Sequence, residues 1–327
     1  AQWLATYPDS GIRSGMEYYI APAEQTPEVQ AQIDAITPKL LDPEAITLID
    51  PAVGSGHILV EAYDLFRAIY LERGYTKREA ARAILTKNLF GLDIDDRAAQ
   101  MAGFALLMKA CADDRTVLRS PPKLNVLALQ DSEGLDAGAL AKALLPQERF
   151  EMVSSGDLLP ETLSQPTLSA QQPTSAEAKA IKALVELFDG AKTFGSLITV
   201  TDAVMNSLPS LDALLAKPLT GDLLRRQSHA DAQEALKPLV ALAQVLGGQY
   251  DCVVANPPYM GSAFFNEKLS KFASLEFPAW DSELFSCFIK RCLTFNKYGG
   301  ISSLISNGTW MFLPTFHAMR YDLMSNY

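Results

Sequence analysis

The sequence predicts an α/β fold in which helices flank a mostly parallel central sheet, and three strand-like runs carry this prediction. The first run, residues 46–49, leads into a glycine-rich turn and an amphipathic helix. The second, residues 89–94, ends in acidic residues and is followed by another helical pattern. The third, around Val253, stops at two prolines. Strands that alternate with helices are typical of parallel sheets, whose ligands lie over the carboxyl ends of the strands.

The composition indicates a globular chain without a membrane span. With 327 residues, 48% of them apolar, the chain can fill the core of one large domain with an insertion or of two small ones. Residues 1–15 lack the pattern of a signal peptide, and no stretch approaches the ~18 consecutive apolar residues of a transmembrane helix. A cytoplasmic protein is therefore expected.

The cysteines and histidines show no spacing typical of a metal site. Buried free thiols explain the four cysteines better than metal ligands do, and no metal is expected. The cysteines are Cys111, Cys252, Cys287 and Cys292, and the histidines are His57, His229 and His317.

The net charge of −10 argues against tight binding of nucleic acid by this chain alone. Affinity for a phosphate backbone comes mostly from Lys and Arg side chains that neutralise phosphates. A basic surface would have to be local or lie outside the chain. The chain starts at Ala1 rather than methionine and reaches Tyr327 within a helical pattern, so a fragment of a longer protein is expected.

The regular pattern begins near Ala45. Residues 1–44 show only a short helix at 28–36 and read as an approach segment rather than a core element. A strand, the turn Asp-Pro-Ala-Val-Gly-Ser-Gly at 50–56 and a helix ending at Gly74 then form the opening of a Rossmann-like unit. Leu59 occupies the place of the third glycine in a dinucleotide fingerprint, so a pyrophosphate clamp is disfavoured.

The second strand, residues 89–94, delivers a cluster of carboxylates. Asp93 is assigned to a ligand, because an acidic residue at the end of this strand is well placed for ribose hydroxyls. Asp95 or Asp96 is expected to cap the following helix, residues 97–112. The apolar face of that helix is predicted to include Met101, Phe104, Leu107 and Met108.

The Asn-Pro-Pro-Tyr turn at 256–259 suits transfer of a group to a planar amine. Pro257 and Pro258 cannot donate to a sheet ladder, so the backbone leaves the sheet in a stiff, extended shape. The Asn256 side-chain oxygen and the Pro257 carbonyl can accept hydrogen bonds from an amino group whose lone pair is otherwise delocalised, while Tyr259 stacks on the ring. The alternative is a strand that ends in a polyproline turn with an interfacial tyrosine.

Residues 132–248 form the longest insertion. Residues 160–176 are rich in Pro, Gln, Ser and Thr and read as a loop, whereas residues 176–188 and 230–246 have helical periodicity. A mostly helical subdomain is expected, more plausible as a spacer or partner surface than as a second active site.

Aromatic residues follow Tyr259 closely and lead into a helix at 281–298, the glycine pair 299–300 and a strand at 301–305. They form either a loop that stacks or wedges against an extruded base or a hydrophobic cover over the site. These aromatic residues are Phe264, Phe265, Phe272, Phe277 and Trp280.

Four motifs in order resemble the adenine-specific DNA methyltransferases that use S-adenosylmethionine, and most closely the PglX methyltransferases of BREX phage-defence systems. The motifs are Asp-Pro-Ala-Val-Gly-Ser-Gly-His at 50–57, Gly-Leu-Asp-Ile-Asp at 91–95, Asn-Pro-Pro-Tyr-Met-Gly at 256–261, and Gly-Gly at 299–300 followed by Trp-Met-Phe at 310–312. The resemblance runs from about residue 18 to the end of the chain and is weakest across 132–248. It implies a class I methyltransferase fold.

The resemblance implies a role for each motif. Asp93 would bind the ribose of the cofactor, and Asp131, or alternatively Asp157, would face its adenine. Phe285 and Trp310 are candidates for lining the pocket. The methionine end of the cofactor is assigned to Asp50, Gly54 and Gly56, and Pro51, Ala52 and Ser55 are further cofactor-binding residues. The target adenine is assigned to Asn256, Pro257, Pro258 and Tyr259.

The same resemblance predicts three parts and their partners. Residues 1–131 would be the cofactor-binding half, 132–248 the helical insertion and 249–327 the target-base half. Double-stranded DNA would be bound through regions largely outside this chain, and phage-defence proteins or inhibitors are further expected partners. Residues 1–15 lack the Thr-Pro cofactor segment usual in the family. Two alternatives stay open: methylation of a protein glutamine, and a non-catalytic module that binds a partner.

Overall fold

The computed structural model describes residues 2–16, 19–20, 23–145, 175–218 and 223–327. It contains two compact units, one made of Ala1–Ala128 with Gln249–Tyr327 and the other of Leu129–Gly248. Within the described ranges, no helix combines the length and the apolar character needed to cross a membrane.

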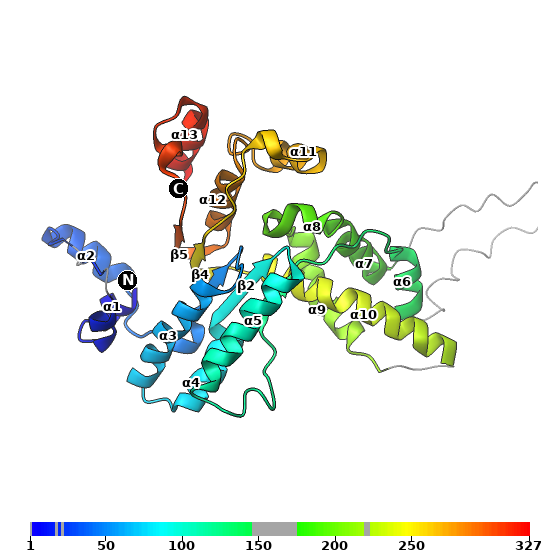
Figure 1. The fold of residues 1–327 in the computed structure, drawn as a ribbon, viewed down its shortest axis with the longest axis horizontal. Coiled ribbons are helices and arrows are strands. Elements are labelled where there is room, and N and C mark those ends of the chain that lie inside the picture. Colours follow the sequence, from blue (N-terminus) through cyan, green and yellow to red (C-terminus); the bar gives the residue numbers. More distant parts are fainter. Residues whose placement is uncertain (1, 17–18, 21–22, 146–174, 219–222) are drawn as a thin grey trace, which may run out of the picture. The chain divides into compact units, whose positions relative to one another are not determined.

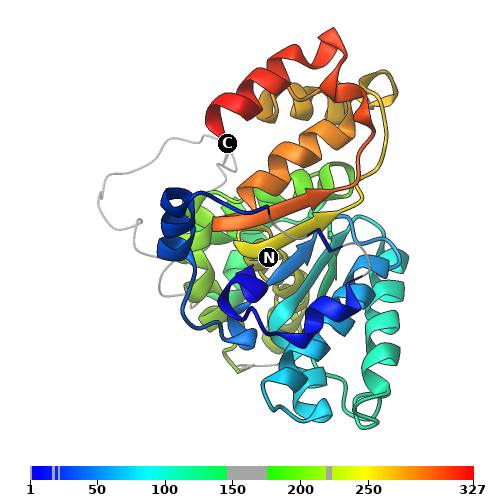
Figure 2. The same ribbon diagram turned by 90° about the vertical axis from the view of Figure 1, so that its left-hand side faces the viewer.

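The first unit is built on a five-stranded sheet in the order β3-β2-β1-β4-β5, and every neighbouring pair is parallel. Figure 2 shows β5, β4, β1 and β2 side by side in this order. The α/β expectation is confirmed. Because the chain leaves β1 in one direction and returns on its other side, the carboxyl ends of β1 and β4 flank the point where ligands bind in such sheets. The strands are β1 (Leu48–Asp50), β2 (Leu89–Asp93), β3 (Asn125–Ala128), β4 (Tyr250–Ala255) and β5 (Asn296–Leu304).

Helices α3 (His57–Glu72) and α5 (Asp96–Cys111) pack on each other and on β2 (Figure 1). α3 contributes its predicted apolar side, including Leu59 and Phe66, to the core, which continues into α4 (Lys77–Ala83). Tyr70, also on α3, donates a hydrogen bond to the buried Asn88, whose amide in turn donates to the carbonyls of Pro43 and Ile46.

The predicted apolar face of α5 is wrong at three of its four residues; the fourth, Leu107, is partly buried and packs against the core. Met101, Phe104 and Met108 are exposed, and the helix buries mainly small residues instead. The reason is a close approach: a Cβ atom on Gly56 would lie 2.8 Å from the Cα of Ala102. Only small side chains fit where α5 comes this near the glycine turn. The buried residues are Ala99, Ala102, Gly103, Leu106 and Ala110.

Strand β5 begins at Asn296, earlier than the predicted start at residue 301. The preceding helix, α12 (Leu284–Thr294), ends before the glycine pair rather than at it. The Phe295 carbonyl accepts from the Tyr250 N–H at 2.7 Å, which already starts the pairing with β4. Gly299 has φ 77° and lies at an irregularity of the β4–β5 register, so the glycines serve a bulge inside the strand.

The amino-terminal segment packs against α3. Trp3 and Ile12 form a small apolar cluster with Ile69, and the Glu72 carboxylate accepts from the Ser10 hydroxyl at 2.7 Å and from the Gly11 N–H at 3.0 Å. The predicted short helix is present as α2 (Pro27–Ile36) and follows α1 (Gln2–Thr6).

The remaining helices of the first unit are α11 (Glu267–Glu276) and α13 (His317–Asn326). Its short helical turns are η1 (Gly11–Gly15), η2 (Pro43–Ala45), η3 (Ile84–Asn88), η6 (Ser262–Phe264), η7 (Gly308–Met311) and η8 (Pro314–Phe316). All four cysteines are free thiols; Cys287 and Cys292 are buried, while Cys111 and Cys252 are partly exposed.

The regular elements of the second unit, within its described residues, are all helices, and residues 129–136 and 198–201 are non-helical connections. α9 packs on α10, and α7 contacts both α6 and α9. Most of the predicted loop at 160–176 lies outside the described residues. The elements are α6 (Ala137–Leu144), α7 (Ala176–Leu187), α8 (Ala191–Phe194), η5 (Gly195–Leu197), α9 (Asp202–Leu215) and α10 (Leu223–Leu246).

Candidate active site

Asp50 ends strand β1 and starts the glycine turn. Its side chain is 1% exposed, and its Oδ1 accepts from the Ala52 N–H at 3.0 Å. Pro51 and Ser55 lie in the same turn, which closes when the Gly56 N–H donates to the Val53 carbonyl at 2.9 Å. Asp50 therefore shapes the turn from inside the fold.

The two glycines of the turn play different parts. Gly56 has φ 86° and is the N-cap residue of α3, where Ala102 leaves no room for a Cβ atom. Gly54 has φ 52°, and a Cβ atom there would meet nothing within 4 Å. The turn is thus packed tightly on one side and open on the other, which suits a ligand that approaches the backbone and the amino end of α3.

Asp93, at the end of β2, fastens this turn to the neighbouring strand. Its Oδ2 accepts from the Gly54 N–H at 2.8 Å and its Oδ1 from the Asp95 N–H at 2.9 Å. The Val53 N–H adds a bond to the Leu92 carbonyl at 2.9 Å. Asp95 caps α5 by accepting from the Arg97 N–H at 2.8 Å, which confirms one of the two predicted capping residues.

Burial raises the pKa of Asp50 to about 7, and the nearby Asp93 carboxylate adds to the rise, against the lowering effect of the Ala52 N–H. Two carboxylates close together disfavour a second negative charge unless a cation or a proton compensates. The arrangement therefore favours a ligand that brings positive charge to the glycine turn.

The Asn-Pro-Pro-Tyr turn follows strand β4 directly. Pro257 is buried, whereas Asn256 and Tyr259 are exposed, Tyr259 by 52%. The Tyr259 hydroxyl lies 3.1 Å from the carbonyl oxygen of Ile305, to which it donates, and 3.3 Å from the Asn256 Oδ1. One hydroxyl proton cannot fully serve both oxygens, so the Asn256 oxygen keeps capacity for another donor.

Neighbouring strands bring the two turns to the same edge of the sheet, the one formed by the carboxyl ends of its parallel strands. Leu48 of β1 pairs with Cys252 of β4, and Ile49 pairs with Val253. Adjacent strands lie about 4.8 Å apart. Asp50 and Asn256 therefore leave the sheet at the same edge, on adjacent strands, next to the reversal of strand order.

Phe285 and Trp310 take different positions near the Asn-Pro-Pro-Tyr turn. Phe285, on α12, is fully buried, and its ring centroid lies 6.3 Å from that of Tyr259 and 5.9 Å from that of Phe316. It supports Tyr259 from the core side. Trp310 is partly buried and donates to the Ser306 hydroxyl at 3.2 Å.

Asp131 lies in the second unit, where it organises a loop. Its Oδ1 accepts from the Glu133 N–H at 2.9 Å and the Gly190 N–H at 3.2 Å, and its Oδ2 accepts from the backbone N–H of Lys192 at 3.4 Å. The alternative candidate, Asp157, lies outside the described residues. The contact with the cofactor adenine stays a prediction.

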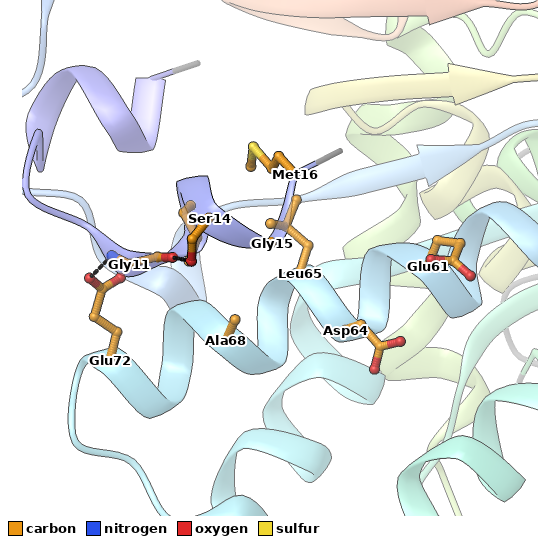
Figure 3. A pocket seen from close by; sticks show the side chains of 10 residues that line it. Gly11, Ser14, Gly15, Met16, Glu61, Asp64, Leu65, Ala68 and Glu72 are labelled. Carbon is orange, nitrogen blue, oxygen red and sulfur yellow. Dashed lines mark hydrogen bonds between the residues drawn. The ribbon is translucent and has the colours of Figure 1, made fainter. Parts of the chain in front are cut away.

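A pocket of about 580 Å³ lies elsewhere, between η1 and α3 (Figure 3). Glu61, Asp64 and Leu65 of α3 line it together with Met16, and it contains none of the predicted site residues. No group of three or more His, Cys, Asp and Glu side chains suited to a metal ion was found among the described residues.

Sequence reasoning missed two features of the site. The first is the Ile305 carbonyl, which holds the Tyr259 hydroxyl across a separation of 46 residues. The second is the antiparallel bridge between Gly261 and Glu283, which fixes the chain just beyond the Asn-Pro-Pro-Tyr turn. Each contact joins segments that are distant in the chain and involves at least one backbone group, so no local pattern predicts it.

A parallel sheet with a glycine turn and an Asn-Pro-Pro-Tyr turn at the same edge is what the sequence resemblance to methyltransferases led us to expect. Residues 87–327 match the Eco57I restriction-modification methylase family, and residues 25–140 match the DNA-methyltransferase domain of MmeI. The first match covers most of the chain, which therefore belongs to the Eco57I restriction-modification methylase family.

Two curated relatives extend the similarity over almost the whole chain. It is 44% identical over 326 residues to the adenine-specific methyltransferase BrxX of Escherichia coli O9:H4 (strain HS), covering 99% of this chain and 26% of that protein. It is 31% identical over 315 residues to the adenine-specific methyltransferase PglX of Lacticaseibacillus casei (strain Zhang), covering 94% and 23%. The predicted resemblance is confirmed, and the chain spans about a quarter of the length of these relatives.

Proposed function

We propose that this chain is the catalytic domain of a DNA adenine N6-methyltransferase that uses S-adenosylmethionine and modifies host DNA in a BREX-type phage-defence system. The observation that carries the proposal is the meeting of the Asp93-fastened glycine turn and the exposed Asn-Pro-Pro-Tyr turn at one sheet edge. The names of the two relatives, both adenine-specific methyltransferases, support it. DNA modification of this kind implies a cytoplasmic protein.

The glycine turn fits the cofactor. Gly54 leaves open space, and the carboxylates of Asp50 and Asp93 favour a ligand that brings positive charge. The segment 50–56 would hold the methionine end, Asp93 the ribose and Asp131 the adenine. S-adenosylmethionine supplies an electrophilic methyl group on a positively charged sulfur.

Asn256 and Pro257 would make the target amine nucleophilic. The lone pair of an adenine N6 amine is delocalised into the ring, and acceptors for its two N–H groups return electron density to nitrogen. Asn256 is exposed and its Oδ1 retains acceptor capacity, and Pro257, whose residue is buried, offers its backbone carbonyl. Catalysis then depends on positioning and on acceptors set in place before the reaction.

Tyr259 would stack on the extruded adenine. Half of its surface is exposed, while its hydroxyl is tied to Ile305 and Phe285 packs nearby. A base stacked on such a ring gains ~1–3 kcal/mol. This offsets part of the few kcal/mol needed to take a base out of the duplex.

The DNA duplex itself would be gripped mostly outside this chain. The net charge of −10 provides little neutralisation of phosphates. Other components of a phage-defence system, or inhibitors of it, are further proposed partners, with the helical insertion as a surface available to them.

The test measures transfer of labelled methyl groups by the full-length protein to DNA from a strain that lacks the modification. We expect N6-methyladenine as the product, and Asn256→Ala should lower the rate by roughly 10²–10³-fold. Calorimetry should show cofactor affinity within about 2-fold of the unsubstituted protein, because the side chain serves the acceptor amine.

Asn307→Ala is a matched control, since Asn307 is also an amide in a turn; it is partly buried and caps the short helix η7. Near-normal transfer by Asn256→Ala would refute the assignment of the turn. Absence of both cofactor binding and transfer in the full-length protein would favour a non-catalytic module.

A further inference from the structure

The chain between the Asn-Pro-Pro-Tyr turn and α12 forms an excursion, residues 262–282, whose two ends are joined. The Leu284 N–H donates to the Met260 carbonyl at 2.8 Å, and the Ser262 N–H donates to the Ser282 carbonyl at 3.1 Å. Gly261 and Glu283 form an antiparallel bridge between these bonds. The backbone at the start of the excursion, directly after Tyr259, is therefore held in place by these contacts.

The late aromatic residues of the excursion form a cover. Trp280 is fully buried and donates from its indole N–H to the Asp322 Oδ2 at 2.7 Å, and its carbonyl accepts from the Ser286 hydroxyl. Phe277 is 3% exposed and lies against the ring of Phe272. These side chains secure the excursion to α12 and α13, so they are not free to contact a substrate.

Phe264 is different, because 80% of its side chain is exposed. It ends the short helix η6, whose first turn closes when the Phe264 N–H donates to the Gly261 carbonyl at 2.9 Å. Phe265, the next residue, donates to the Ser262 carbonyl at 3.1 Å and is partly buried. A large apolar ring is thus held in solvent on a backbone that is hydrogen-bonded on both sides of it.

Phe264 also lies close to the proposed base site along the chain. It follows Tyr259 by five residues, which limits the separation of the two Cα atoms to at most about 18 Å. The intervening backbone is shortened by the η6 turn and fixed by the joined ends of the excursion.

We propose that Phe264 inserts into the base stack of the DNA duplex at the position vacated by the extruded adenine. This inference rests on the proposed function. Extrusion leaves a gap between two base pairs, and an apolar side chain that fills it slows return of the base. Phe264 fits this task because it is apolar and exposed, and because it follows closely the hydrogen-bonded backbone that joins the ends of the excursion next to Tyr259.

The charges of the excursion agree with an apolar rather than an electrostatic contact. Lys271 is paired with Glu267 at 2.7 Å on α11. The excursion also carries Glu276 and Asp281, so it offers little net positive charge to phosphates. Contact with a gap in the stack requires no such charge.

The test compares Phe264→Ala with Leu275→Ala in the full-length protein. Leu275 lies on the same excursion and is similarly exposed, at 78%, but follows Tyr259 by 16 residues. Two duplexes are used for each protein, one with the target adenine in a normal pair and one with an abasic site opposite it. The abasic partner weakens the pair, so the adenine leaves the stack without help.

Phe264→Ala should lower kcat/KM for the normal duplex at least 10-fold. On the abasic duplex, kcat/KM of the same variant should lie within about 3-fold of the unsubstituted protein. Leu275→Ala should stay within about 2-fold on both duplexes, and Phe264→Trp should retain most activity on the normal duplex. Fluorescence of 2-aminopurine at the target position should rise less with Phe264→Ala, while cofactor affinity stays unchanged.

Normal activity of Phe264→Ala on the paired duplex would overturn the inference. An equal loss on both duplexes would also overturn it, because it would assign the side chain a purely structural role. Failure of the unsubstituted protein to methylate either duplex would instead refute the proposed function, and this inference with it.

Discussion

The glycine turn and the Asn-Pro-Pro-Tyr turn lie at the same sheet edge but are stabilised in opposite ways. The glycine turn is held by carboxylates: Asp50 is buried beneath it, and Asp93 binds the Gly54 N–H. The Asn-Pro-Pro-Tyr turn is held by a buried proline ring and one hydroxyl bond from Tyr259, and its polar groups face solvent.

The difference matches the ligands proposed for the two turns. A small cofactor that diffuses freely can bind to a turn that is already formed. Internal hydrogen bonds within that turn do not block its access. A base arrives from a duplex, and its acceptors and stacking surface must stay exposed to meet it. Changes in the glycine turn should therefore affect folding and cofactor binding, and changes in the Asn-Pro-Pro-Tyr turn should affect catalysis with little effect on stability.

The largest effect on stability is expected from Gly56→Ala. The new Cβ atom would lie 2.8 Å from the backbone of Ala102, at a φ of 86° that alanine rarely adopts. Overpacking and backbone strain together should lower the free energy of unfolding by about 3 kcal/mol. Gly54→Ala is the matched control: it has φ 52° but no neighbour within 4 Å, so about 1 kcal/mol is expected.

Urea denaturation of both variants would measure the difference between the two glycines. Equal destabilisation by the two substitutions would show that the close approach to α5 does not determine the turn.

Asp93→Asn should remove one hydrogen bond that holds the glycine turn while leaving a side chain of the same size in place. An amide has one oxygen, so either the Gly54 or the Asp95 N–H loses its acceptor and faces an NH₂ group instead. Loss of a hydrogen bond to a charged group corresponds to about 1.5–3 kcal/mol. Cofactor affinity measured by calorimetry should fall accordingly, while Asp96→Asn, which alters a neighbouring carboxylate, should leave it close to normal. Unchanged cofactor affinity in Asp93→Asn would contradict the proposal that the cofactor binds at this turn.

Several parts of this arrangement could be predicted from local sequence, because they depend on residues close together in the chain. The glycine turn, the cap at Asp95 and the exposure of Asn256 directly before two prolines are of this kind. The α5 face could not be predicted, because the nearness of Gly56 to Ala102 is a tertiary contact that reverses the usual preference for large apolar residues.

The carboxyl-terminal half illustrates the same limit. The glycines at 299–300 look like a helix end, yet pairing with β4 begins at Asn296 and turns them into a bulge. Phe264 and Trp280 have the same apolar character in the sequence, and only the joined ends of the excursion and the bond from Trp280 to Asp322 separate an exposed ring from a buried one.

Asp50 should make stability depend on pH. Its pKa is raised from 3.8 to about 7 in the folded chain, so between these values the folded state holds a proton that the unfolded state releases. Stability from this group is fully present below pH ~4 and is lost as pH rises through ~7. The free energy of unfolding should fall by about 2 kcal/mol between pH 5 and 7 from this residue alone.

Asp50→Asn removes this dependence while its Oδ1 can still accept from the Ala52 N–H. Its stability should change less over the same interval when measured in the absence of cofactor. A cationic ligand favours the charged carboxylate, so cofactor affinity of the unsubstituted protein should rise with pH across the same range. A pH profile identical in the two proteins would mean that Asp50 is already ionised when the site is empty.

Tyr259→Phe should have the smallest effect and separates the two proposed roles of this side chain. The substitution removes the hydroxyl bond to Ile305 but keeps the ring that stacks on the base. A hydrogen bond at a half-exposed position contributes about 0.5–1.5 kcal/mol, so kcat/KM on duplex DNA should fall roughly 2–10-fold, with unfolding almost unchanged. Tyr259→Ala should lose the stacking as well, about 1–3 kcal/mol more.

The comparison of these two tyrosine variants also tests how the Asn-Pro-Pro-Tyr turn is held. If Tyr259→Phe lost as much activity as Tyr259→Ala, the hydroxyl bond to Ile305 rather than the ring would be the essential feature. The turn would then depend on its link to Ile305, the residue after β5, much as the glycine turn depends on Asp93, and the contrast between a preformed and an open side of the site would disappear.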